Sequence, residues 1–568
     1  METRRFLLAI SLSLIIFILY MKFFAPTPPE TQPANDATNM AETQKKVAEK
    51  RENTIPEPLK SSNPASVKIE KAVAGKDIVI ETDLIKAVVN TAGGVITKWE
   101  LKQYREANKS EVGIGVIYKK ITGQMPKEEK PKRELGNVEL VPVYEGVDRK
   151  DMSYPLAMVP LEKDLNKLSG VNYETSSGSL LLSKDKPKET LTLVYNGPGG
   201  IIIEKKLTFH NDTYVVDMDI RTSGFDGYTI SLGTDFGLAD KVSSDASGRV
   251  GVADVLDKKF RNEKIGDLKG EEQQAGSVGW IAQEDKYFTA VLISNGNGII
   301  SRKKTVEPKA IGDLLTTDLT VKEQASARTF KLFAGPKSYT LLEAQGQGLE
   351  QMVDYGWFGI LAKPMFWLLT KFYIFTKNYG VAIILLTIVV RVLLFYPSLK
   401  SATAMEEMKK IQPQLMAIRE KFKKDPQRMN QEMMKLYKEH KVNPLGGCLP
   451  MLLQLPFFVA LYNVLSVSIE LRQSPFLSFW IKDLSVYDPY YILPVLMGVS
   501  MIFTMKMTST TADPQQAKIM MFMNIAFIFL FAWLPAGLLL YITLSNVLSI
   551  VQQLYVRRLI GAAETPAV

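Results

Sequence analysis

The stretch YGVAIILLTIVVRVLLFYP, residues 379–397, decides the fold class of this chain. Its only charged side chain is that of Arg391. About 20 apolar residues in an α-helix suffice to cross the roughly 30 Å hydrocarbon core of a bilayer. A charge near the bilayer centre costs on the order of 2.5–3.5 kcal/mol on insertion scales, so it needs water, a polar partner or a route to the surface. The stretch therefore predicts a membrane-spanning helix that contains one costly residue.

Apolar runs of the same kind occur at residues 6–24, 448–467, 490–507 and 519–556. The last run is too long for one span, and the sequence LPAG at 534–537 provides a break and a tight turn. We therefore expect six transmembrane helices, one at the N-terminus and five after residue 378. Because none of these spans contains Asp or Glu, no acid within them is available to pair with the arginine.

The charges of the loops predict the orientation. Residues 398–447 contain eleven Lys or Arg against six Asp or Glu, whereas residues 468–489 contain two against three. Lys and Arg accumulate in cytoplasmic loops, so the first of these loops and both termini should be cytoplasmic. The formal net charge of +9 has the same explanation, and direct binding of nucleic acid is the less favoured alternative.

The N-terminal region predicts an anchor and a tether. Arg4 and Arg5 precede an apolar run that is longer than the roughly 7–15 residues of a signal-peptide core. We therefore interpret residues 1–24 as an uncleaved transmembrane anchor. Residues 25–66 are rich in Pro, Glu, Lys and Asn, which is typical of a disordered tether.

Residues 67–340 have the two-residue periodicity of β-strands. Val216, Met218 and Ile220 alternate with charged residues, as expected for a strand with one buried face. The preceding run, 201–210, joins this strand through a predicted turn at Asn211 and Asp212. Further strands are expected at 78–82, 95–101, 287–293 and 329–333. The fold class is therefore a polytopic α-helical membrane domain with a large all-β antiparallel sandwich on the outer side.

The residues of the common catalytic and metal sites are missing from the sequence. It contains no G-x-S-x-G, H-E-x-x-H or Walker motif, one cysteine, Cys448, and two histidines. An intramolecular disulfide and a Cys/His zinc cluster are therefore impossible. We expect neither metal nor cofactor, and a protein that is not an enzyme; a catalytic outer domain is the less favoured alternative.

Residues 341–378 should connect the two domains. They include an apolar helix with Trp357 and Trp367, interrupted by three lysines. This combination favours an amphipathic helix in the outer membrane interface, broken near Pro364. The alternative is a core helix of the outer domain.

The cytoplasmic loop, 398–447, predicts a helical hairpin. The apolar side chains of its first helix step by three and four residues, and Asp425 followed by Pro426 begins a second helix with a matching stripe. Met405, Met416 and Met434 fall off this seam. They are candidates for contacts with varied apolar partners, although the favoured role of the seam methionines is hairpin core.

Arg391 is the main candidate for a functional site in the membrane. One interpretation is that its side chain extends to the cytoplasmic surface, because Pro397 is near. The other is a water-accessible cationic cavity among the helices. Polar residues of the predicted spans would line that cavity: Thr387, Gln454, Asn463, Thr543 and Asn546.

Five stretches of the sequence resemble the membrane domain of the YidC-type insertases. They are VVRVLLFYP (389–397), KVNPLGGCLPMLLQLPFFVALYNVL (441–465), ELRQSPF (470–476), DLSVYDPYYILPVLMGVSM (483–501) and PAGLLLYITLSN (535–546). The resemblance covers roughly residues 355–558. The anchor and outer domain resemble the form of Gram-negative bacteria, in which that domain is a periplasmic β-sandwich.

The resemblance implies a five-helix insertase domain at 379–558, followed by a short tail at 559–568. Its hydrophilic groove would be open to the cytoplasm and to lipid, with Arg391 as the groove arginine. The family's groove Thr and Tyr correspond to Thr387 and Tyr541, although Ile542 stands where some relatives have a second aromatic residue.

Such proteins place newly made membrane proteins in the inner membrane, alone or with the Sec translocon, and act as chaperones without ATP hydrolysis. Their substrates arrive from ribosomes and the signal recognition particle pathway, so contact with nucleic acid would occur only through the ribosome. Two other classes are less favoured. A solute transporter should show internal repeats, which we do not find, and an envelope scaffold or sensor would leave Arg391 without a role.

Overall fold

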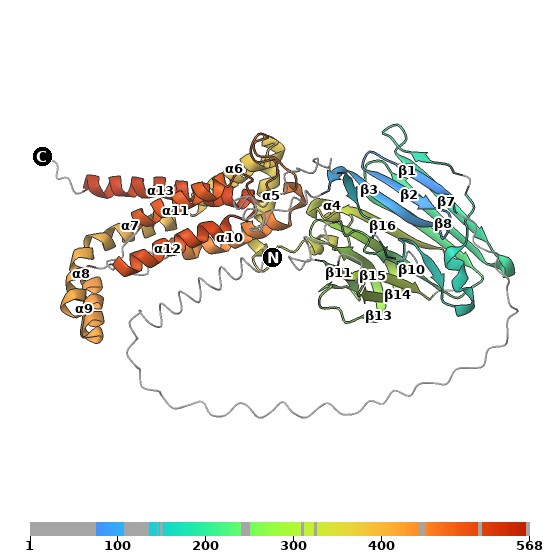
Figure 1. The fold of residues 1–568 in the computed structure, drawn as a ribbon, viewed down its shortest axis with the longest axis horizontal. Helices are drawn as coiled ribbons and strands as arrows, with labels where there is room; N and C mark the ends of the chain where they lie inside the picture. Colours follow the sequence, from blue (N-terminus) through green and yellow to red (C-terminus); the bar gives the residue numbers. More distant parts are fainter. Residues whose placement is uncertain are drawn as a thin grey trace, which may run out of the picture.

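The computed structural model describes residues 75–106, 136–144, 146–147, 152–175, 177–239, 250–307, 312–322, 327–440, 442, 449–508 and 514–563. The predicted anchor (1–24) and tether (25–66) lie outside these ranges. Figure 1 shows a strand-rich part, here called the β domain, beside a group of helices. The hairpin of α8 (Gln412–Lys421) and α9 (Pro426–Glu439) lies at the end of the helices that is farthest from the β domain. Helices α4 (Tyr339–Glu343) and α5 (Gly359–Thr376) lie nearest to it.

Strands occur at all six predicted stretches, because alternating apolar residues give each strand one buried face. The structure adds further strands between them. The bounds are β1 Asp77–Glu81, β2 Ile85–Asn90, β3 Val95–Arg105, β4 Asn137–Glu139, β5 Met158–Pro160, β6 Leu180–Leu181, β7 Lys188–Asn196, β8 Ile202–His210, β9 Val215–Ser223, β10 Tyr228–Thr234, β11 Gly251–Leu256, β12 Lys259–Lys264, β13 Glu271–Glu284, β14 Phe288–Thr305, β15 Leu314–Val321 and β16 Arg328–Pro336. The predicted hairpin is confirmed: β8 and β9 pair antiparallel, from Ile202 opposite Ser223 to Phe209 opposite Val216.

The strands form two sheets. The smaller has the order β4-β3-β2-β1-β6, and the larger follows the path β12-β11-β13-β14-β16-β9-β8-β7, with β10, β15 and β5 joined off this path. The pairing is antiparallel except between β1 and β6, which run parallel. Trp99 connects the sheets: its ring is fully buried, its Nε1 donates to the carbonyl of Ala334 at 3.0 Å, and it meets Phe236 edge to face. The core of the β domain therefore lies between two sheets, as in a sandwich.

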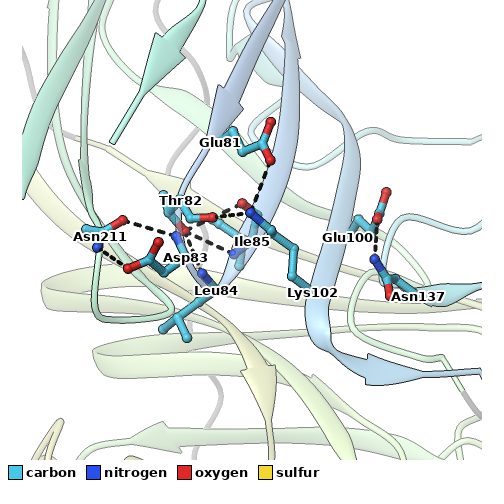
Figure 2. Close-up of polar contacts among 9 residues, drawn as sticks. All are labelled: Glu81, Thr82, Asp83, Leu84, Ile85, Glu100, Lys102, Asn137 and Asn211. Carbon is cyan, nitrogen blue, oxygen red and sulfur yellow. Dashed lines mark hydrogen bonds and ion pairs between the residues drawn. The ribbon is translucent and has the colours of Figure 1, made fainter. Parts of the chain in front are cut away.

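Polar contacts join the edges of the two sheets (Figure 2). Asn211, in the β8–β9 turn, accepts from the backbone N–H of Asp83 at 3.0 Å and donates to its carboxylate at 2.7 Å. Nearby, the Lys102 ammonium donates to Glu81 at 3.1 Å and to the carbonyl of Thr82 at 2.8 Å. Asn211 is buried, so its paired amide fixes the β1–β2 turn against the larger sheet.

The helices of the C-terminal part follow the predicted apolar runs closely. They are α4 Tyr339–Glu343, α5 Gly359–Thr376, α6 Tyr379–Leu393, α7 Phe395–Lys410, α8 Gln412–Lys421, α9 Pro426–Glu439, α10 Leu449–Val467, α11 Ile492–Thr508, α12 Pro514–Phe531 and α13 Ala536–Ala563. The predicted break at LPAG is confirmed, because α12 ends and α13 begins there. The N–H groups of Ala536 and Gly537 bond to the carbonyls of Val486 and Leu484, which satisfies the start of α13.

The predicted break of α5 near Pro364 is wrong, because the helix continues through this proline. Pro364 lies near the N-terminal end of α5, so its missing N–H removes one helical bond close to a terminus. Helix α5 packs against α6 and α10, and its Phe366 contacts the rings of Tyr339 and Tyr355. The opposite face of α5 is apolar and exposed: Ile360, Trp367 and Phe375 are all more than half accessible, as is Trp357 just before the helix.

One described helix, Ala536–Arg558, is long and apolar enough to cross a membrane by itself. The pair α6 and α7 passes the same test together, with a bend of 65° between them. Shorter apolar helices cover Leu453–Val467, Ile492–Met507 and Met521–Phe531.

The hairpin forms as its sequence pattern predicts. The Asp425 side chain accepts from the N–H of Arg428 and caps α9. A separate apolar cluster joins α8 and α9, with Met408, Ile411, Leu415, Met433, Leu436 and Val442 buried. Heptad-like spacing on both helices therefore produces a small core of its own.

Candidate functional site

Arg391 lies in the last turn of α6 and bonds to two neighbouring helices. Its Nε donates to the hydroxyl oxygen of Ser545 on α13 at 3.0 Å. Its Nη2 donates to the backbone carbonyl of Ser545 at 2.6 Å and to Oε1 of Gln454 on α10 at 3.3 Å. The guanidinium thus connects α6, α10 and α13 at one point, which we call the arginine cluster.

Gln454 and Ser545 also bond to each other. The Gln454 amide donates from Nε2 to the hydroxyl oxygen of Ser545 at 2.9 Å, while its Oε1 faces the guanidinium. Tyr541 is almost fully buried and lies one turn before Ser545 on α13. It is close enough to Arg391, Gln454 and Ser545 to interact with them electrostatically. The cluster is therefore a polar network inside an otherwise apolar group of helices.

The partners of Arg391 are all neutral. It forms hydrogen bonds but no ion pair with any residue that the structure describes. Helices α6, α10 and α13 carry no Asp or Glu. Hydroxyl, amide and carbonyl oxygens stabilise a guanidinium without cancelling its charge. The positive charge is therefore held in place but not neutralised.

The structure brings three of the predicted groove residues together, Arg391, Gln454 and Tyr541, and adds Ser545. Sequence reasoning missed Ser545, although its spacing of four residues from Tyr541 places it on the same face of α13. A search of the neighbouring turn for small polar residues would have found it.

The other predicted groove residues bond elsewhere. Thr387 and Thr543 donate to carbonyls one turn earlier in their own helices, those of Ile383 and Leu539. Asn546 donates to Ser500 on α11 at 3.1 Å. Asn463 donates to the carbonyl of Tyr355, at the end of α10 that is near the β domain. None of these four side chains bonds to the guanidinium.

The three candidate methionines of the hairpin differ in exposure. Met416 on α8 is 46% exposed and Met434 on α9 is 50% exposed. The predicted exposure of Met405 is wrong, because it packs with Ala402 and Val556 between α7 and α13. Met405 lies off the hairpin seam and belongs to a second contact, between α7 and α13, which the sequence pattern of the hairpin alone does not show.

That second contact fixes the base of the hairpin. The Glu406 carboxylate accepts from Lys409 at 2.6 Å and from Arg557 at 3.0 Å, and both cations also donate to the carbonyl of Met507 at the end of α11. Helices α7, α11 and α13 therefore meet in one charged group. No cluster of three or more potential metal-ligating side chains occurs in the described ranges.

Two family models match this chain. Residues 371–563 match the model described as the 60Kd inner membrane protein, and residues 149–368 match the YidC periplasmic domain. The first match covers the end of α5 and the helices α6–α13, and the second covers most of the β domain, α4 and the start of α5. The chain is thus an inner-membrane protein with a periplasmic β-rich domain and a helical C-terminal region.

Similar curated proteins agree over the whole length. The membrane protein insertase YidC of Syntrophus aciditrophicus is 34% identical, over 98% of this chain and 99% of its own. That of Geobacter metallireducens is also 34% identical, over 99% of both chains. A crystal structure titled as an active YidC insertase with its first transmembrane domain resolved is similar at 19% identity and a TM-score of 0.36, over 87% of this chain and 94% of its own. This chain belongs to the YidC family of membrane protein insertases.

Proposed function

We propose that this protein inserts newly made membrane proteins through a polar path at the arginine cluster, and that it helps them to fold. The observation that carries the proposal is the charge of Arg391, which neighbouring helices hold with neutral partners only. A charge that no described anion of the protein cancels is available to an anion that arrives from outside. The acidic tail of an incoming single-span protein is such an anion.

The energetics support this mechanism. Polar groups and water partway through the bilayer shorten the apolar barrier that the tail must cross. The apolar span of the substrate then moves sideways into lipid, driven by burial of apolar surface. The membrane potential acts on the charges of the translocated tail in addition. These terms require no ATP hydrolysis.

The topology that suits this path has six spans and both termini in the cytoplasm. The cluster would then be open to the cytoplasm and to lipid, with the hairpin and its exposed Met416 and Met434 on the side where ribosomes and signal-recognition particles deliver substrates. The apolar, lysine-bearing face of α5 would rest in the outer interface of the membrane. Cooperation with the Sec translocon belongs to the same proposal.

The test is depletion of the protein in its own cell, with complementation by wild type, Arg391→Ala, Arg391→Lys or Arg558→Ala. Arg558 lies exposed at the end of α13 and is the matched control for loss of a positive charge. Protease accessibility of a small single-span protein with an acidic outer tail reports insertion. We expect insertion to stall with Ala at position 391 and to recover with Lys and with the control. Normal insertion without the protein, or with Arg391→Ala, would refute the proposal.

A further inference from the structure

Three residues after α10 contact the β domain. Glu470, Arg472 and Gln473 lie between α10 and α11, where a short 3-10 turn, Ile469–Leu471, ends the helix. We call these three residues the dock. Their partners come from three separate segments of the β domain: the end of β3, the start of β14 and the residues that follow β16.

Arg472 makes the most extensive contact of the dock. Its Nη1 donates to the carbonyl of Arg105 at 2.9 Å, at the end of β3. Its guanidinium lies over the ring of Phe288 at 5.1 Å and that of Tyr287 at 5.6 Å, at the start of β14. The side chain is almost fully buried. A charge in this position is stabilised by ring faces and a carbonyl of the other domain, so the contact is specific to that domain.

Gln473 pairs with the backbone of the same residue, Arg105. Its Oε1 accepts from the N–H of Arg105 at 3.3 Å, and its Nε2 donates to the carbonyl of Arg105 at 3.0 Å. The amide therefore reproduces the two-bond pairing of neighbouring strands. The backbone of Gln473 has a φ of 58°, a conformation that non-glycine residues rarely adopt. Such strain persists where surrounding contacts determine the conformation, as these two bonds do.

Glu470 and Asn463 add two contacts on the same side. Glu470 accepts from the hydroxyl of Ser338 at 2.8 Å, directly before α4. Asn463, on the last turns of α10, donates to the carbonyl of Tyr355 at 2.7 Å. Burial raises the pKa of the Glu470 carboxyl. The outer end of α10 is thus held by four side chains that bond to segments outside the helical bundle.

Helix α10 also carries Gln454, a member of the arginine cluster. The distance along the helix from residue 454 to residue 467 is about 20 Å at the α-helical rise. Pro456 removes only the backbone bond to the carbonyl of residue 452, so the stretch from residue 454 to residue 467 is helical throughout. A helix of this length transmits a displacement of one end to the other. The position of the dock therefore determines where Gln454 stands relative to Arg391.

We propose that the dock is a positioning element for insertion: Arg472 and Gln473 fix α10 against the β domain and so hold Gln454 beside Arg391. This inference rests on the proposed function of the arginine cluster. It gives the β domain a part in the membrane step, in addition to any role it has outside the membrane. Arg472 and Gln473 are positioning residues, because they act on the cluster only through α10.

The test uses the full chain in proteoliposomes, with Arg472→Ala/Gln473→Ala, Arg472→Lys and the control Lys482→Ala. Lys482 is an exposed cation of the same loop. Insertion of the acidic-tailed protein is measured together with hydrogen exchange of α10 and of the β-strands. We expect the double variant to insert roughly tenfold more slowly, the loss that about 1.4 kcal/mol produces. Exchange should rise along α10 and stay unchanged in β8 and β9, which the dock does not contact, while Lys at position 472 restores part of the rate.

A second variant guards against simple misfolding. Cysteines at positions 338 and 470, in a chain whose Cys448 is replaced by Ser, are joined by a short bifunctional maleimide. We expect the joined protein to insert its substrate at the normal rate. Adding Arg472→Ala to the joined protein should no longer slow insertion, because the linker replaces the dock.

The outcomes separate the two proposals. If Arg391→Ala stops insertion but the double variant leaves both the rate and the exchange of α10 unchanged, the dock has no positioning role and this inference is wrong. It is equally wrong if protection is lost throughout the β-strands, because the dock then only stabilises the fold. If Arg391→Ala inserts normally in the same vesicles, the proposed function itself fails.

Discussion

Two buried charges of the molecule, one in the β domain and one among the helices, have opposite surroundings. In the β domain, the Asp254 carboxylate is almost fully buried and pairs with Arg302 and with Arg261, whose Nη2 is 2.6 Å away. Arg302 also pairs with Glu263 at 3.0 Å. Among the helices, Arg391 is held by a serine and a glutamine. One set of charges is cancelled within the protein, and the other is not.

This difference separates structural from functional charge. A buried ion pair that is fully satisfied stabilises one arrangement of its strands and offers nothing to a ligand. An arginine whose partners among the described residues are all neutral incurs a desolvation cost that no described anion offsets. A fold retains such a residue at a cost to its stability, and the proposed insertion of acidic segments would give it a use.

The largest expected effect is the loss of stability when the buried ion pair of Arg302 and Asp254 is broken. Arg302→Ala leaves the carboxylate of Asp254 buried beside one remaining cation, and removal of one partner of a buried pair costs about 3–5 kcal/mol. We expect chemical denaturation of the full chain in detergent to show a loss of this size for the β domain. The neighbouring exposed Lys303→Ala is the control. A loss below about 1 kcal/mol would mean that this pair behaves like an exposed one.

A smaller effect on the stability of the β domain is expected from Lys205, a buried cation with no carboxylate partner among the described residues. Its ammonium donates to the carbonyls of Gly93, Gly94 and Leu156, at 3.0, 3.1 and 2.9 Å, and lies 5.0 Å from the centre of the Tyr173 ring. Burial lowers the pKa of Lys205 to about 7. Between pH 7 and the ordinary lysine pKa of about 10.5, the unfolded chain binds more protons than the folded one.

The stability of the β domain should therefore rise with pH in this window, by up to about 1.4 kcal/mol per pH unit. Lys205→Met should remove this slope, whereas Lys206→Met should leave it, because Lys206 pairs with Glu204 at the surface. Hydrogen exchange of β8 at several pH values, corrected for the intrinsic rate, measures the effect. An unchanged slope in Lys205→Met would show that the carbonyls compensate fully for burial.

Local patterns in the sequence predicted most of the elements. Alternation of apolar residues located β8 and β9, and the proline-glycine break located the start of α13. These features depend on neighbours in the sequence, which determine which face of a strand or helix is apolar. The break predicted at Pro364 failed because the effect of a proline depends on its distance from the helix end, and the run of apolar residues did not define that end.

Contacts between distant segments were not predictable in the same way. Arg391 and Gln454 were chosen because they are polar in apolar runs, and this reasoning cannot tell Gln454, which bonds to the arginine, from Asn463, which bonds to Tyr355. Met405 was assigned to a hairpin surface because α13 could not be placed against α7. In each case the deciding partner lies on another element, and only the packing of the bundle reveals it.

The smallest expected effect concerns Ser545, the neutral partner that distinguishes the arginine cluster from the ion pairs of the β domain. Ser545→Ala removes the hydroxyl that accepts from Arg391 and Gln454, but keeps the backbone carbonyl and the charge. Loss of one hydrogen bond of this kind costs about 1 kcal/mol. Because the guanidinium stays in place but is less well oriented, insertion should slow by a few-fold rather than stop.

The measurement is the insertion rate in proteoliposomes, with Ser549→Ala, the same change one turn further along α13, as the control. An effect as large as that of Arg391→Ala would mean that Ser545 itself contacts the substrate, and neutral partners would then be part of the binding surface. An unchanged rate would mean that Gln454 and the carbonyl orient the arginine without the hydroxyl. A few-fold loss of the insertion rate would show that Ser545 orients the guanidinium of Arg391 without cancelling its charge. The carboxylates around Arg302, in contrast, cancel the charge of that residue.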